Sequence, residues 1–225
     1  MTVTDVLYRW PNAAYFGRRV PKEKFYEHAR VNTALREKFI SEVDRVTWAY
    51  DLAEATINLA GTDEVPDIAV FQIDAKGTDV SEPVLSAVDT SMPRPLVFEI
   101  NRDFAGVRET RMVAAHKQLG TGAPKTSQYF STAWQPADTE RQPLPTAITL
   151  PTLYAALLEP LANVEVRPGE GMSDVADRLK VVGKIEREIK TLERKLRTEK
   201  QFNRKVELRR TLKTKQAQLT ALIER

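Results

Sequence analysis

Apolar residues recur at intervals of three and four along residues 173–225, a stretch that is rich in charge and contains no proline. This spacing predicts helices with one apolar stripe each. Twelve residues separate the last apolar position of the first stripe from the first position of the second, which places the two stripes about 120° out of phase on one straight helix. The first stripe comprises Val182, Ile185, Ile189, Leu192 and Leu196, and the second comprises Leu208, Leu212, Leu219 and Leu222.

Folding the stretch back on itself about Phe202 brings the two stripes together. Ile189 then meets Lys215, the one mismatch, whose aliphatic stem can still cover apolar surface. The pattern therefore predicts an antiparallel helical hairpin with its tip near residues 200–204. No glycine or proline marks that turn, so one long kinked helix is the alternative. The paired positions are Leu196 with Leu208, Leu192 with Leu212, Ile185 with Leu219 and Val182 with Leu222.

The first 165 residues predict an α+β body with a small, mainly antiparallel sheet and flanking helices, because strand patterns are joined by short polar turns. An irregular aromatic segment over residues 1–21 precedes it, and residues 56–59 look like a short extended piece. Residues 166–172 form a linker to the coiled-coil arm, residues 173–225. The expected helices begin near Pro21, Asn32, Ser81 and Leu150, and the expected strands cover residues 46–50, 65–73, 96–100, 110–115 and 128–134.

Charge is divided unevenly along the chain. Residues 173–225 hold 16 Lys and Arg against 8 Asp and Glu, which gives them a net charge of +8. Since the whole chain has a net charge of +3, the other 172 residues carry −5. A basic helical arm favours nucleic acid, an acidic protein face or anionic lipid, or it only keeps a coiled coil in solution. The candidate contact residues lie near the expected tip; they are Lys200, Arg204, Lys205, Arg209 and Arg210.

The absence of cysteine excludes disulfides and thiolate chemistry, and no apolar run approaches the length of a membrane span. We therefore expect a cytoplasmic protein. No phosphate-binding glycine loop, serine-hydrolase elbow or cofactor motif is present, so we expect no cofactor and no metal. Of the two histidines, His28 is expected on a helix surface and His116 as a hydrogen-bonded structural residue.

Residues 66–76 contain Pro-Asp followed by Asp-Ala-Lys, which is similar to the signature of PD-(D/E)xK nucleases. Asp67 and Asp74 are seven positions apart on one expected strand, so they point to opposite faces and cannot share a metal ion. A looser set, Asp89, Glu99 and Lys117 from successive elements, keeps a divergent metal-dependent nuclease open as an alternative. Nothing in the sequence distinguishes that set from surface charge.

The order of short motifs resembles a bacterial family catalogued as domain of unknown function 4391. The motifs run from Pro21-Lys22 and Phe25-Tyr26 through Thr47-Trp48 and Tyr129-Phe130 to residues 201–205. The resemblance implies a compact α+β domain. It also implies genes near helicases and DNA methyltransferases in phage-defence clusters, and it supplies no established activity.

These observations together predict a non-enzymatic accessory or adaptor subunit of a bacterial DNA-processing or phage-defence complex. Its basic arm would contact nucleic acid or a larger helicase- or methyltransferase-type partner. The alternatives are the divergent nuclease and a self-associating coiled-coil protein that forms a homodimer through the arm. No membrane partner is expected.

Overall fold

The computed structural model describes residues 6–29, 31–118, 125–126, 128–162, 172–199 and 201–223. The chain divides into two compact units, Met1–Asn163 and Val164–Arg225, which we call the body and the arm. Each unit is treated by itself below. In the described ranges no helix combines the length and apolar character that crossing a membrane requires.

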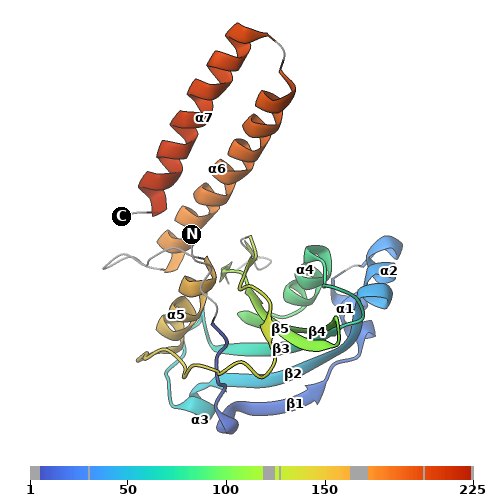
Figure 1. Cartoon of the computed structure of the whole chain (residues 1–225). Helices are drawn as coiled ribbons and strands as arrows, with labels where there is room; N and C mark the ends of the chain where they lie inside the picture. The colour runs from blue at the N-terminus through green and yellow to red at the C-terminus, as the bar shows by residue number, and fades with distance from the viewer. Residues whose placement is uncertain are drawn as a thin grey trace. The chain divides into compact units, whose positions relative to one another are not determined.

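The described residues of the body form five α-helices and one main sheet, and Figure 1 shows how these elements are arranged. Its helices are η1 (Asn12–Ala14), α1 (Lys22–His28), α2 (Thr33–Glu42), α3 (Glu54–Ile57), α4 (Glu82–Thr90) and α5 (Leu150–Ala162). Its strands are β1 (Tyr15–Arg19), β2 (Val43–Ala53), β3 (Asp67–Ala75), β4 (Leu96–Phe104), β5 (Val107–Ala114), β6 (Lys117–Gln118), β7 (Lys125–Thr126), β8 (Phe130–Ser131) and β9 (Gln135–Pro136).

The main sheet has the order β1-β2-β3-β4-β5-β8, with β9 also paired to β5. All of its pairs are antiparallel except β3 with β4, which run parallel. Helix α4 lies between those two strands in the chain, and a crossover of this kind lets the second strand start from the same end as the first. The expected α+β class with a mainly antiparallel sheet is thus confirmed, and the parallel pair is an addition to it.

Helices α1, α2 and α4 pack on one face of the sheet through a continuous apolar core. Phe25 from α1 and Phe39 from α2 stack at 6.1 Å between ring centroids. Side chains alternate between the faces along a strand, so Phe98 and Ile100 of β4 enter this core while Glu99 points to the opposite face. That opposite face is where Trp10 meets Glu99.

Several local expectations differ from the structure. The expected extended piece at residues 56–59 is partly helical: α3 ends at Ile57, and its C-cap residue Asn58 adopts the left-handed conformation at φ 55°. Residues 15–19 are not irregular but form β1, whose bulge is made possible by Gly17 at φ +63°. The strand expected over residues 128–134 is reduced to the two residues of β8, because only these two pair with β5.

The arm is a helical hairpin made of α6 (Met172–Thr198) and α7 (Phe202–Ile223), which contact each other along their length (Figure 1). Helix α6 spans roughly 40 Å at 1.5 Å per residue. The helical path is interrupted between Thr198 and Phe202. The amide of Gln201 is bound there by the side chain of Glu199 at 2.9 Å, so the turn forms without glycine. The hairpin interpretation is confirmed.

The burial pattern of the two arm helices and one ion pair between them are compatible with the predicted register. Val182, Ile185 and Ile189 are buried on α6, and the half-buried positions of α7 follow the stripe from Leu208 to Leu222. Lys215, the one polar residue in that stripe, forms an ion pair with Glu188 at 2.7 Å. The mismatch in the stripe is therefore accommodated by a neighbouring carboxylate as well as by the lysine stem.

Candidate functional site

Asp89 and Lys117, two of the residues considered for a nuclease, form a buried ion pair at the end of α4. Their side chains are 3% and 0% exposed. The Lys117 ammonium also donates to three main-chain carbonyls, those of Asp89 at 2.6 Å, Met92 at 2.9 Å and Arg94 at 2.9 Å. The last carbonyls of a helix have no hydrogen-bond partner within the helix, so the Lys117 ammonium caps the C-terminal end of α4.

Two tyrosines lie beside this ion pair. The Tyr129 hydroxyl donates to Asp89 Oδ2 at 2.7 Å, and the Lys117 amide donates to the Tyr154 hydroxyl at 3.2 Å. Burial raises the pKa of Asp89, and the Lys117 ammonium opposes that shift. Burial likewise lowers the pKa of Lys117, against the effect of the carboxylate. A group that acts on a substrate must reach it, and neither side chain reaches the surface; the pair is structural.

Glu99 belongs to a different cluster on the other face of the sheet. Its side chain is fully buried and accepts hydrogen bonds from Trp10 Nε1 at 2.7 Å and from Gln72 Nε2 at 3.0 Å. The Arg141 guanidinium pairs with Glu99 Oε1 at 2.5 Å and also donates to the Tyr8 carbonyl. Glu99 therefore fastens the start of the chain and the segment before α5 to the sheet.

The structure thus brings Asp89 and Lys117 together and leaves Glu99 elsewhere. Within the described ranges no three His, Asp or Glu side chains gather closely enough to hold a metal ion. Asp67 and Asp74 of the Pro-Asp stretch are also occupied: Asp67 pairs with Arg94 at 2.9 Å, and Asp74 binds Arg45 at 2.7 Å. The side chains proposed for a nuclease therefore do not form one centre.

His116 is buried beside Tyr154, with ring centroids 6.1 Å apart. His28 is the last residue of α1. Neither position forms part of a group of metal ligands in the part of the chain that the structure describes.

The basic residues expected at the arm tip are only partly on one surface. Lys200 lies outside the described residues, and Arg204, Lys205, Arg209 and Arg210 all lie on α7. Successive residues are turned by about 100° around a helix, so Arg204 and Arg209 are about 140° apart. Helix α7 nevertheless carries six Lys and Arg against one Glu, a net charge of +5.

A groove of about 510 Å³ runs along one flank of the hairpin, above Leu192. Lys184, Arg187, Lys195 and Lys215 line it, with Glu188 as its one carboxylate. Glu188 is held by Lys215, whose hydrogen bond lowers the pKa of Glu188. Lys184 and Lys195 are exposed and line that flank; among the described residues neither forms an ion pair, although the charge of Lys184 also lowers the pKa of Glu188.

A second groove of about 570 Å³ continues toward the turn and is lined by Lys195 and Arg204, but also by Glu199 and Glu207. The first groove is therefore the more basic of the two. Sequence reasoning missed it because its residues come from two helices. A signal was present in the predicted pairing of Ile189 with Lys215, since that register places 184–195 beside 211–215.

The sequence profile of one family matches residues 9–219 of the chain, and its description is "Domain of unknown function (DUF4391)". No curated protein and no solved structure gave a match.

Proposed function

Because the chain belongs to the DUF4391 family, from which no activity can be transferred, we propose its function from its charges: a non-enzymatic accessory subunit whose basic arm contacts nucleic-acid phosphates. The observation that carries this proposal is the basic groove on the arm. Its cations come from both helices of the hairpin, so helical secondary structure positions them and none of them lies on a loop. Phosphate contacts of this kind supply most of the affinity of proteins that bind nucleic acid without reading its sequence.

The division of charge supports the same conclusion. Residues 173–225 carry +8, whereas the other 172 residues carry −5. An acidic body is repelled by a polyanion, so the arm is the part suited to approach one, while the body is left to dock on a protein. The bacterial DNA-processing or phage-defence complex that the family resemblance implies would supply that protein partner.

Binding of the full chain to duplex DNA, measured at two salt concentrations, tests the proposal. We expect affinity that falls steeply with salt, because each phosphate contact releases condensed counterions. No binding even at low salt would refute the nucleic-acid contact. Reversing the charges of Arg204, Lys205, Arg209 and Arg210 together is expected to abolish binding, since it removes most of the positive charge of α7.

A matched pair of double variants tests the groove itself. Lys184→Glu with Lys195→Glu changes two exposed cations on the groove flank of α6. Lys190→Glu with Arg197→Glu makes the same change in net charge on exposed positions about 140° around the same helix. We expect the groove variant to weaken DNA binding at least about tenfold more than its control and to lower the salt slope by about 2. Equal losses in the two variants would contradict the assignment to this flank.

A further inference from the structure

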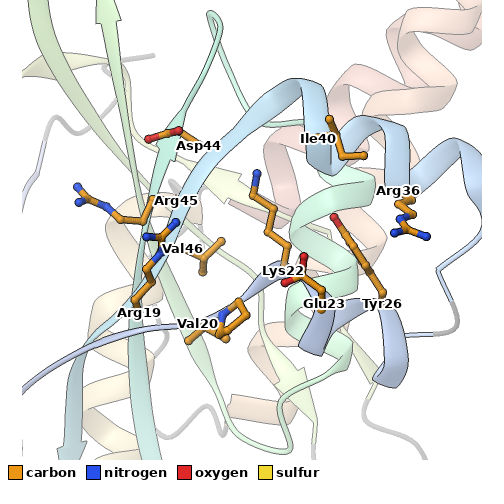
Figure 2. A pocket seen from close by; sticks show the side chains of 11 residues that line it. Arg19, Val20, Lys22, Glu23, Tyr26, Arg36, Ile40, Asp44, Arg45 and Val46 are labelled. Carbon is orange, nitrogen blue, oxygen red and sulfur yellow. The ribbon is translucent and has the colours of Figure 1, made fainter.

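A pocket of about 410 Å³ opens in the body beside the edge of the sheet, between β1 and β2 on one side and α1 and α2 on the other. Figure 2 shows Lys22 near its centre, with Arg19 and Arg45 on the strand side and Tyr26 and Arg36 on the helix side. The charged residues of its wall are four cations and two acids: Arg19, Lys22, Arg36, Arg45, Glu23 and Asp44.

Two of these cations already have partners. Arg45 is held by Asp74 at 2.7 Å, and the Lys22 ammonium donates to the carbonyl of Val43 and, at 3.4 Å, to that of Phe39. Lys22 is thereby fixed at the end of α2 with its charge not matched by a carboxylate in direct contact.

The other two cations have no carboxylate partner among the described residues. Arg36 lies over the ring of Tyr26, 5.3 Å from its centroid, and this stacking holds the guanidinium at the rim of the pocket. Arg19 is exposed at the end of the edge strand β1. Both guanidinium groups therefore keep all of their donors for a ligand.

The positive charges in this region act on one another. Burial lowers the pKa of Lys22, and the nearby Lys76 and Arg19 lower it further, while Asp44 and Glu23 act in the opposite direction. A cation whose pKa is lowered by its cationic neighbours is stabilised when an anion enters. The pocket thus has an excess of positive charge that its own acids do not remove.

We propose that this pocket binds the terminal phosphate of a phosphomonoester, held by Arg19, Lys22 and Arg36. A phosphomonoester carries about −1.5 to −2 charges, which matches the two unpaired guanidinium groups. The three cations come from three elements, β1, α1 and α2, and line the same pocket, an arrangement that suits the several oxygens of a tetrahedral group better than the two of a flat carboxylate. The volume is in the range of small-ligand sites, and Val20, Ile40 and Val46 give it an apolar wall.

The site is separate from the arm and does not depend on the arm's contact with nucleic acid. Its phosphate has two possible sources of the same chemistry, a free nucleotide or the phosphorylated end of a nucleic-acid strand.

Calorimetric titration of the full chain with inorganic phosphate tests the proposal. We expect saturable binding to one site that weakens at least about tenfold in the variant carrying Arg19→Gln and Arg36→Gln, because two charge-assisted contacts are lost. Among the described residues neither guanidinium donates a hydrogen bond within the protein, and the main-chain bonds of both residues remain in the variant, so it is expected to fold. The matched control is Arg18→Gln with Lys38→Gln, two exposed cations outside the pocket wall. Absence of saturable binding, an equal loss in the control, or acetate binding as tightly as phosphate would overturn the assignment.

The source of the phosphate is settled by two further ligands, adenosine monophosphate and an oligonucleotide with or without a 5′-phosphate. Binding of the mononucleotide that is lost in the pocket variant assigns a free nucleotide. A preference for the 5′-phosphorylated oligonucleotide that is lost in the same variant assigns a strand end. The arm variant Lys184→Glu with Lys195→Glu is expected to leave inorganic phosphate binding unchanged, which separates this site from the proposed function of the arm.

Discussion

Replacement of Lys117 by methionine is expected to destabilise the body strongly. Methionine fills a similar volume but removes the ammonium that pairs with Asp89 and binds three main-chain carbonyls. The Asp89 carboxylate would then stay buried with hydroxyl partners only, chiefly Tyr129. Breaking a buried ion pair from one side costs about 3–5 kcal/mol of unfolding free energy, a large part of the roughly 5–15 kcal/mol of a typical domain.

Urea unfolding followed by tryptophan fluorescence measures this effect in the body alone, because Trp10, Trp48 and Trp134 all lie in the first unit. With a slope of about 2 kcal/mol per molar urea, the midpoint should fall by about 2 M. The double variant Asp89→Asn with Lys117→Met removes the uncompensated charge and should recover about 1–3 kcal/mol. A loss below about 1 kcal/mol for Lys117→Met would refute the structural role of the pair and would return both residues to consideration as functional groups.

Three further outcomes are expected. Glu99→Gln keeps the shape of the side chain but weakens its charge-assisted bonds, so the same urea assay should show a loss of about 1.5–3 kcal/mol; an unchanged midpoint would argue against a charged Glu99. Because the chain has no cysteine, Glu188→Cys with Lys215→Cys should crosslink on oxidation and shift on a non-reducing gel, whereas Lys190→Cys with Lys215→Cys should not, since Lys190 points about 200° away from Glu188; crosslinking of both pairs would contradict the hairpin register. Burial and the charge of Glu159 in α5 raise the pKa of Tyr8 to about 12. The contribution of Tyr8 to the free energy of unfolding is therefore fully present below the unfolded-state pKa of about 10 and is lost as the pH rises through 12. Urea midpoints that stay constant between about pH 10 and 12 would contradict this expectation.

The arm could be predicted from the sequence in unusual detail because its structure depends on local periodicity. The 120° offset between the stripes excluded one straight helix, and the symmetry about Phe202 predicted the hairpin that is observed, with a register compatible with the Glu188–Lys215 ion pair. What the sequence did not supply was which cations of the two helices share a flank. The grouping of these cations depends on how the two helices are rotated about their axes relative to each other. The order of charges along the chain does not determine that rotation.

In the body, the positions of helices and strands were predicted better than the pairing of the strands. The helix beginning at Ser81 and the strand at residues 96–100 were both expected, yet their consequence, a parallel pair of β3 with β4, was not inferred. The nuclease set failed for a related reason. Neighbouring residues on a strand point to opposite faces of the sheet. Phe98 is buried in the apolar core, so Glu99 points to the other face. The position of Asp89, by contrast, depends on how α4 packs, and this packing places Asp89 beside Lys117 and not beside Glu99.

The bonds of Glu99 also have a consequence for the order in which the protein can fold during synthesis. Glu99 binds Trp10, 89 residues earlier, and Arg141, 42 residues later. At about 5–20 residues per second, a ribosome needs roughly 2–8 s to extend the chain from Glu99 to Arg141. During that interval Glu99 lacks Arg141, which also binds the Tyr8 carbonyl, so we expect the start of the chain to reach its final packing only after Arg141 has been added. The arm, whose ion pair joins residues 27 apart, forms without such a delay once it leaves the ribosome.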